Sequence, residues 1–229
     1  MDFPGGLHTG ASARLLTVSL EVPRTQALLR AASAERGVQM TGLLLTALAR
    51  TLARWTGHAR SLVDLHDHGR DIVESLDVSR TVGWLNFLFP VVLDAGQGAA
   101  PAESLRNIQR RLREIPQRGL GHGLLRYLCG EPSVMEALKA LPQPQLLFNY
   151  RGHFTGAATA LPPGVRPARE SSGIGYSLRV VRRHLLMVNA QIAHEALHVE
   201  WVYSEQVHRR GTVEALARGY FEELESLLP

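Results

Sequence analysis

The segment DLHDHGRDIVESLDVSRTVGWLNFLFP, from Asp64 to Pro90, carries polar residues that no packing requirement explains. One polar cluster, HDHGRD at residues 66–71, follows a short apolar run, and a second, SRTVGW at residues 79–84, precedes another apolar run. The apolar runs predict two strands, so the first cluster lies on a loop at a strand end. Loops that a rigid scaffold positions are common places for functional residues. We therefore expect a functional site between the two strands.

Two later segments combine glycine and polar residues in a similar way. PQRGLGHG spans Pro116 to Gly123, and FNYRG spans Phe148 to Gly152. The glycines of the first segment follow a predicted helix and not a strand, which argues against a dinucleotide-binding loop. We expect a tight turn at the start of a helix there, and a strand through FNYRG.

The four segments resemble successive motifs of the epimerization domains of nonribosomal peptide synthetases, which belong to the larger condensation-domain family. In those domains the motifs read approximately (D/N)LEGHGRE, RTVGWFTxxxP, PxxGxGYG and FNYLG, in this order. This chain departs from them with His66 in place of the first glutamate, Asp67 in place of the glycine that follows it, and His122 in place of a tyrosine. Strand-like segments near both ends also look like parts of the C-terminal lobe of such a domain, so the resemblance covers nearly all of residues 1–229.

The resemblance implies a set of site residues. The glutamate that His66 replaces is thought to act as an acid or base at the substrate α-carbon, and a histidine with an unperturbed pKa of about 6.5 can also act as a base. Asn149 and Tyr150 are the other implied catalytic residues. Asn149 either fastens neighbouring backbone or orients a substrate thioester. The residues expected to support the site are Asp67, His68, Arg70, Asp71, Arg80, Trp84 and His122.

The polar loop also has a simpler interpretation. Arg70 could pair with Asp67 or Asp71 in an exposed turn at which no reaction takes place. Arg80 and Trp84 are residue types that more often organise a structure than react, and Arg80 could brace the site loop through charge-assisted hydrogen bonds.

The resemblance also implies partners. In the family, a motif HHxxxDG supplies the second catalytic residue from an N-terminal lobe, and this chain contains no His-His pair. The expected partners are therefore an N-terminal lobe that bears HHxxxDG and a peptidyl carrier protein. The substrate would be attached to the phosphopantetheine arm of the carrier, so we expect no cofactor bound directly to this chain, and no metal.

We therefore expect part of an epimerization domain, which converts the α-carbon of a carrier-bound aminoacyl or peptidyl thioester from L to D and is inactive without the N-terminal lobe. Two alternatives remain: a lobe of a peptide-bond-forming condensation domain, and a noncatalytic module that binds the carrier protein. The RTVGW segment favours epimerization over condensation, whereas His66 and the missing lobe favour the binding module.

The periodicity of apolar residues predicts one α/β domain, in which helices pack on a mixed β-sheet. The resemblance makes this a chloramphenicol-acetyltransferase-like, or CoA-dependent acyltransferase-like, lobe. An irregular excursion is expected at residues 155–173. Strands are predicted at residues 16–22, 61–65, 85–93 and 146–151 and as three segments within 175–204, and helices at 23–35, 41–56, 102–114, 123–129, 133–140 and 213–228.

Composition excludes several classes of protein. Hydrophobic residues make up 45% of the chain, which is enough for a substantial core. Cys129 is the single cysteine, so no internal disulfide forms, and its apolar surroundings in the sequence predict that it is buried. The net charge is only +4 and the arginine pairs are scattered, which argues against nucleic-acid binding. No apolar run approaches the roughly 20 residues of a membrane span, so a soluble cytoplasmic protein is expected.

The sequence HEALH, from His194 to His198, matches the zinc-protease motif H-E-x-x-H literally. That motif needs a helix, which places both imidazoles on one metal ion. Apolar residues alternate with polar ones from Leu197 to Tyr203, which is the period of a strand. We therefore expect a hairpin that turns at residues 194–196, and a metalloprotease is only a remote alternative.

Overall fold

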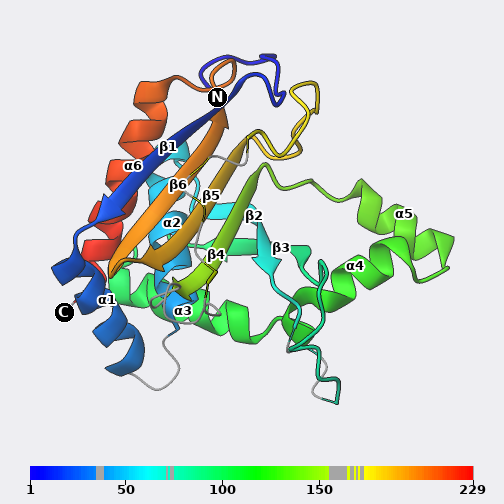
Figure 1. Ribbon diagram of the computed structural model, residues 1–229, viewed down its shortest axis with the longest axis horizontal. Helices are drawn as coiled ribbons and strands as arrows, with labels where there is room; N and C mark the ends of the chain where they lie inside the picture. The colour runs from blue at the N-terminus through cyan, green and yellow to red at the C-terminus, as the bar shows by residue number, and fades with distance from the viewer. Residues whose placement is uncertain are drawn as a thin grey trace.

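The computed structural model describes residues 1–34, 39–70, 72, 75–154, 164, 165, 168, 170 and 173–228. Helices and strands follow one another in mixed order along these residues (Figure 1). The elements are β1 (Ala13–Leu20), α1 (Val22–Ala34), α2 (Met40–Thr56), β2 (Arg60–Asp67), β3 (Phe87–Asp94), α3 (Pro101–Arg113), a short 3-10 turn (Pro116–Gly119), α4 (Leu120–Tyr127), α5 (Pro132–Ala140), β4 (Leu146–Phe154), β5 (Leu186–Ala193), β6 (Ala196–Ser204) and α6 (Arg210–Glu225).

The described strands form one six-stranded sheet in the order β1-β6-β5-β4-β2-β3. Strand β4 runs parallel to β2 and β5, and the other neighbouring pairs are antiparallel. The sheet is therefore mixed, as predicted. Helices α1, α2, α3 and α6 contact the strands from one side, and in Figure 1 the strands β6, β5 and β4 lie in front of α2.

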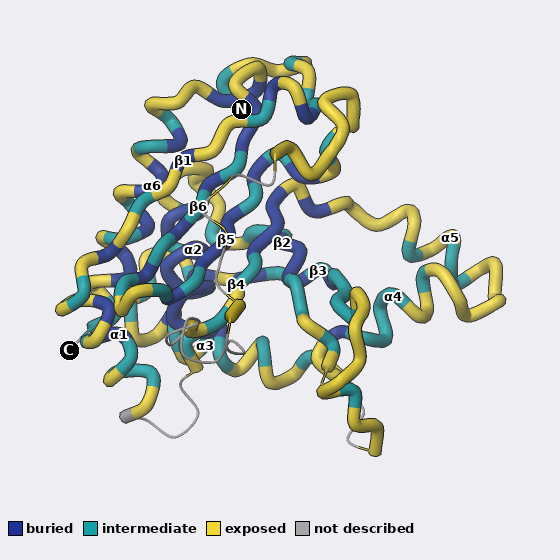
Figure 2. Tube along the Cα trace, in the orientation of Figure 1, coloured by how far each residue is buried: buried dark blue, intermediate teal, exposed yellow. Residues whose placement is uncertain are grey.

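The core lies between the sheet and these helices. Trp201 of β6 and Tyr220 of α6 are fully buried, and their rings meet edge to face with centroids 5.9 Å apart. Burial of large apolar side chains of this kind is the main favourable contribution to folding. Figure 2 shows buried residues concentrated along the central strands and α2.

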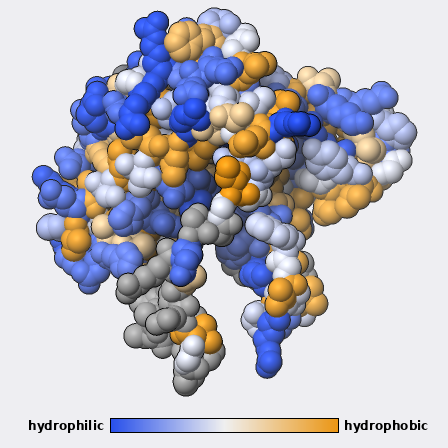
Figure 3. Space-filling model, turned by 45° about the horizontal axis from the view of Figure 1, so that its top comes forward, coloured by the Kyte–Doolittle hydropathy of each residue, from blue (hydrophilic) through white to orange (hydrophobic). Residues whose placement is uncertain are grey.

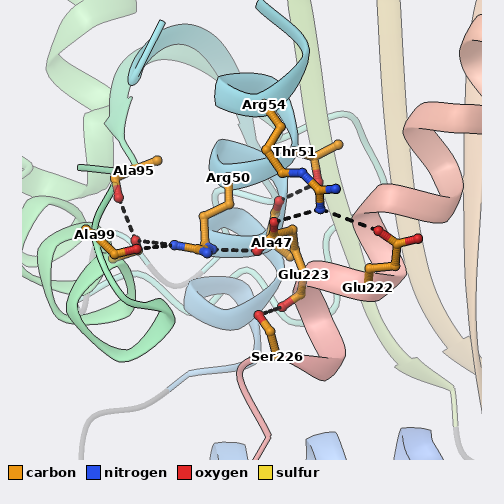
Figure 4. Close-up of polar contacts among 10 residues, drawn as sticks. Ala47, Arg50, Thr51, Arg54, Ala95, Ala99, Glu222, Glu223 and Ser226 are labelled. Atoms are coloured by element: carbon orange, nitrogen blue, oxygen red, sulfur yellow. Dashed lines mark hydrogen bonds and ion pairs between the residues drawn. The ribbon is translucent and has the colours of Figure 1, made fainter. Parts of the chain in front are cut away.

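An ion-pair network joins α2 to α6 and to the loop between β3 and α3 (Figure 4). The side chain of Arg50 donates to the carboxylate of Glu223 over 2.5 Å, to the Ala99 carbonyl over 2.8 Å and to the Ser104 hydroxyl over 3.0 Å. Arg54 reaches the other carboxylate oxygen of Glu223 over 3.1 Å. The Glu223 side chain is only 6% exposed, so its charge depends on these two arginines for compensation.

An arm formed by α4 and α5 extends from the β3 side of the sheet (Figure 1). Neither helix contains a buried residue. Its exposed apolar side chains stand beside hydrophilic ones at the right of Figure 3. They are Leu124, Leu125, Tyr127, Leu128 and Leu141.

Two predictions about this architecture are wrong. Cys129 is exposed, because it follows α4 on the arm, where no described element covers it. Residues 175–204 contain two strands and not three, since the backbone of residues 178–182 bonds to the N-terminal segment at residues 8–11 instead of to the sheet. The predicted excursion at 155–173 lies mostly outside the described residues.

The predicted hairpin is confirmed. Strand β5 ends at Ala193 and β6 begins at Ala196, and the two turn residues, His194 and Glu195, have φ values of 50° and 64°. His194 therefore lies in a turn and His198 in a strand, so they do not share the helix face that a zinc-protease motif requires.

Among the described residues, no helix is long and apolar enough to cross a membrane.

Candidate functional site

Strand β2 presents different chemistry on its two faces. Val63 and Leu65 belong to the core under the helices. Because successive side chains of a strand alternate, Asp64 and His66 point to the opposite face, which we call the open face. His66 is half-buried there.

Strand register places other polar side chains beside His66. In the parallel pairing of β2 with β4, Asp64 lies opposite Leu147 and Leu65 opposite Phe148. The paired stretch ends at Leu65 and Phe148, so His66 and Asn149 are the residues that follow directly on the two strands, and alternation places both on the open face. Asn149 is in turn the register partner of Asn189 on β5.

The row continues across the rest of the sheet. Asn189 lies opposite Glu200 on β6, and Glu200 opposite Thr17 on β1. Arg151, which follows Asn149 on the open face, forms an ion pair with Glu200 over 3.2 Å. Four neighbouring strands thus contribute one register-paired polar residue each, and β2 adds His66 just beyond the end of its pairing with β4. We call these residues the polar row: His66, Asn149, Asn189, Glu200 and Thr17.

His66 is held by Asn86, which immediately precedes β3. The amide nitrogen of Asn86 lies 2.6 Å from Nε2 of His66. An amide nitrogen can only donate, so Nε2 accepts and the ring proton is on Nδ1. Burial lowers the pKa of His66, and the charges of His68 and Arg151 lower it further, while Asp67 raises it. His66 is therefore neutral at pH 7.

Asn149 and Tyr150 were both expected to be catalytic, and they lie on opposite faces of β4. Tyr150 packs against the core, and burial raises its pKa. The amide of Asn149 donates one N–H to the side chain of Asn189 over a long 3.5 Å. Asn149 therefore joins His66 on the open face, whereas Tyr150 is directed to the helix layer.

The polar loop after β2 folds around Arg70 and Asp67. Arg70 donates to the carbonyls of Val78, Thr81 and Gly83 at 3.0 to 3.3 Å. Asp67 accepts a bond from the amide of Gly69 over 2.8 Å, and its other oxygen accepts from the guanidinium of Arg118 over 2.7 Å. The suggested Arg70–Asp67 pairing is thus replaced by an Asp67–Arg118 ion pair.

Two glycines of the predicted motifs are required by close packing. Gly69 has a φ of 67°, and a Cβ atom there would lie 2.1 Å from the carbonyl oxygen of Leu85. Gly119 has a φ of 91°, and a Cβ atom would meet the ring of Phe89 at 2.2 Å. The close approach of Gly119 to Phe89 packs the 3-10 turn before α4 against β3. Arg118 belongs to this turn and reaches Asp67 from it.

The remaining predicted support residues lie apart from the polar row. Arg80 is exposed and makes no hydrogen bond or ion pair with other residues in the described part of the chain, so Arg70 is the arginine that braces the loop. Trp84 is 92% exposed. His68 is exposed and accepts from the backbone amide of Arg70 over 3.1 Å. Asp71 lies outside the described residues.

His122 lies on α4 and lines a pocket with Asp64, not the polar row. Burial lowers its pKa, and the charge of Arg126 lowers it further. Asp64 is buried, 2.7 Å from Nε2 of His184 and 3.3 Å from the guanidinium of Arg183. Asp64 therefore fastens β2 to the segment that precedes β5.

Metal ligation has no support from geometry. Within the described ranges, no three His, Cys, Asp or Glu side chains are grouped so that they could hold a metal ion. His198, one of the two histidines of HEALH, lies with Nδ1 2.7 Å from the hydroxyl of Ser19.

A sequence model of the family described as "Condensation domain" matches residues 10–228. The chain belongs to the condensation-domain family. One of the linear gramicidin synthase proteins of Brevibacillus parabrevis is 39% identical over 224 residues, which are 96% of this chain and 3% of that protein. Chondramide synthase of Chondromyces crocatus is 40% identical over 224 residues, 97% of this chain and 6% of that protein.

Solved structures show the same fold as this condensation-family chain. The epimerization domain from the third module of tyrocidine synthetase B superposes with a TM-score of 0.87 at 30% identity, over 99% of this chain and 50% of that domain. A condensation domain that mediates chain release from the enacyloxin polyketide synthase superposes with a TM-score of 0.69 at 16% identity, over 97% of this chain and 42% of that chain. The predicted α/β, CoA-dependent acyltransferase-like fold is confirmed. The chain spans half or less of these structures and a few per cent of the synthases.

Sequence reasoning missed three residues of this condensation-family site: Asn86, Asn189 and Glu200. Asn189 and Glu200 occupy the polar positions of alternating strands, so the period-2 pattern marked the face on which they lie. Asn86 had no such signal, because its contact with His66 depends on the pairing of β2 with β3.

Proposed function

We propose that this chain is the C-terminal lobe of an epimerization domain of a nonribosomal peptide synthetase. It would act on an aminoacyl or peptidyl thioester attached to the phosphopantetheine arm of a peptidyl carrier protein, together with an N-terminal lobe that bears the second catalytic histidine. The observation that supports the proposal is that His66, at the motif position of the family's glutamate, lies on the open face of β2, directly after the paired stretch that on β4 is followed by Asn149.

Epimerization needs groups that take the α-proton from one side and return a proton on the other. In our proposal His66 is the acid/base group of this lobe. A neutral imidazole accepts a proton only at a nitrogen with a free lone pair, and Nε2 is already engaged by the amide nitrogen of Asn86. His66 would act as the base in its other tautomer, reached when Nε2 takes up a proton from solvent and Nδ1 releases its proton to solvent; the rotated Asn86 amide then accepts from Nε2–H through its oxygen, and Nδ1 is free as the base.

Asn149 would stabilise the charge that forms when the α-proton leaves. Removal of that proton puts negative charge on the thioester oxygen, which a correctly placed N–H donor stabilises. One N–H of Asn149 is directed to Asn189 by a long bond, and its second N–H remains to donate to substrate. Tyr150, on the helix side, would support the strand and not touch the substrate.

The noncatalytic carrier-binding module is the second candidate. It is favoured by one observation, the engagement of Nε2 of His66 by Asn86, which occupies the lone pair needed for a base. A condensation lobe is compatible with the same family and fold, and an assay of peptide-bond formation tests it directly.

The test joins this chain to the N-terminal half of its domain and loads a carrier protein with an L-aminoacyl group. Product chirality and peptide-bond formation are then measured in parallel for the wild type, His66→Ala and His66→Glu. We expect D-product from the wild type and from His66→Glu, and a loss of about 100-fold or more for His66→Ala. Undiminished D-product from His66→Ala would remove His66 from the mechanism, and peptide-bond formation without D-product would establish the condensation alternative.

A further inference from the structure

A pocket of about 480 Å³ opens on the same side of the sheet as the polar row but is separate from it. The part of β2 that lines it runs from Arg60 to Asp64, and α4 contributes His122 and Arg126. His66 is two residues further along β2, about 7 Å away along the strand, and is not part of the lining. The volume falls within the range of roughly 300–1,000 Å³ that is typical of small-molecule sites.

The walls of this pocket are largely apolar. Leu62 of β2 and Val92 of β3 form the side against the sheet. Leu141 and the prolines that follow α5 form the facing side, and Leu141 is 52% exposed although it is a large apolar residue. These surfaces would accept the apolar body of a ligand.

The charged residues of the pocket have an excess of positive charge. The described residues that line it include three arginines, Arg60, Arg126 and Arg183, and one carboxylate, Asp64. Asp64 already accepts from His184 and pairs with Arg183. Within the described part of the chain, the ion-pair partner of Arg60 is the exposed Asp94, at 3.8 Å, and exposed pairs of this kind contribute little.

Arg126 is the pocket arginine whose positive charge has no carboxylate partner among the described residues. Its guanidinium lies 5.5 Å from the centre of the Tyr127 ring. Among the described residues it has no carboxylate partner, and its buried Nε has no acceptor. His122 beside it is neutral at pH 7, because burial and the charge of Arg126 lower its pKa. A ligand with an anionic group would supply the charge that the protein does not.

We propose that this pocket binds a small amphipathic anion, whose carboxylate or phosphate group meets Arg126 and Arg60 and whose short apolar chain lies against Leu62, Val92 and Leu141. The guanidinium fork matches both kinds of anion, so the chemistry on the protein side is the same for the two. This site is independent of the α-carbon chemistry at His66 and can be tested on the chain by itself.

The experiment measures binding of three probes to the full chain by isothermal titration calorimetry. The probes are N-hexanoylglycine, n-hexyl phosphate and the uncharged N-hexanoylglycinamide. We expect at least one anionic probe to bind tenfold or more tightly than the amide. The variant Arg126→Met removes the charge but keeps an unbranched aliphatic side chain, and it should remove that preference. The matched variant Arg113→Met on α3 should retain it. Leu141→Glu should weaken both anionic probes.

The relative affinities of the two anionic probes distinguish the chemical class of the natural ligand. Tighter binding of the phosphate assigns a phosphorylated ligand, and tighter binding of the acylglycine assigns a carboxylate ligand. Equal affinity for the amide and both anions, or an anion preference that survives in a folded Arg126→Met protein, would overturn the proposal. Circular dichroism and thermal unfolding of each variant show whether it is folded.

Discussion

The two faces of the sheet are formed by the same strands but differ in chemistry. On the helix face, Phe148, Val188 and Trp201 are buried in a continuous apolar core, and the Arg50–Glu223 network closes its outer edge. On the open face, the neighbouring residues Asn149, Asn189 and Glu200 form the polar row. Because side chains alternate along a strand, one segment of sequence can supply stability to one face and chemistry to the other.

The neighbouring residues Phe148 and Asn149 give the sharpest test of this contrast. Phe148→Ala should lower the free energy of unfolding by about 4 kcal/mol, because it removes a fully buried ring and leaves a cavity. Asn149→Ala should change it by less than about 1 kcal/mol, since its bond to Asn189 is long. Urea denaturation of both variants measures the difference. Similar losses for the two would contradict the division of the faces.

Substitutions in the ion-pair network of the helix face should have the next largest effect on the free energy of unfolding. Glu223→Ala should cost about 3 kcal/mol, because it leaves the partly buried Arg50 without its carboxylate. Glu222→Ala is the matched control, since its pair with Arg54 is exposed and should contribute less than about 1 kcal/mol. The thermal midpoints of the two variants report the comparison, and equal midpoints would show that the network does not stabilise the helix layer.

Gly69 tests whether the loop beside the open face depends on its geometry. Gly69→Ala should cost about 1–2 kcal/mol, because it puts a Cβ at a positive φ and against the carbonyl oxygen of Leu85. In contrast, Gly83→Ala meets no atom within 4 Å and should be nearly neutral. Limited proteolysis of residues 70–86 together with urea denaturation would detect the change. A stable, resistant Gly69→Ala protein would mean that the loop is not held as described.

A smaller effect should appear as the pH is lowered. The pKa values of His66 and His122 are lowered in the folded chain by burial. Between those folded values and about 6.5, the unfolded chain binds more protons, so the free energy of unfolding falls as the pH drops from 7.5 through this window. His122→Gln should make that fall shallower, and His58→Gln, at an exposed position, should not. Urea titrations at pH 7.5 and 5.5 provide the check.

The sequence was informative where local pattern determines structure. Alternation from Leu197 to Tyr203 predicted the β5–β6 hairpin and excluded the helix that HEALH would need. The apolar run before HDHGRD predicted β2, but the strand continues through His66 and Asp67, which were expected on the loop, because these two residues pair with Leu88 and Phe87 of β3. The features that were predicted depend on residues that are close together in the chain.

Features that depend on distant pairing were not predictable. Asn86 reaches His66 only because β2 and β3 pair, and Asn189 joins the row only through the register of β4 and β5. Tyr150 was grouped with Asn149 because the two are adjacent in the motif, although alternation along the strand separates them. Cys129 looked buried because its neighbours are apolar, but the arm on which it lies is exposed.

The most direct test of the central claim, that the open face supplies an acid/base group without stabilising the fold, is solvent-deuterium incorporation at the α-carbon of a carrier-bound aminoacyl thioester. The rate is measured by mass spectrometry for the two-lobed domain with His66 intact, with His66→Ala and with His58→Ala as the matched control. We predict that His66→Ala lowers the rate by about 100-fold or more, with the free energy of unfolding unchanged to within about 1 kcal/mol. Incorporation at the wild-type rate in a folded His66→Ala domain would contradict the account.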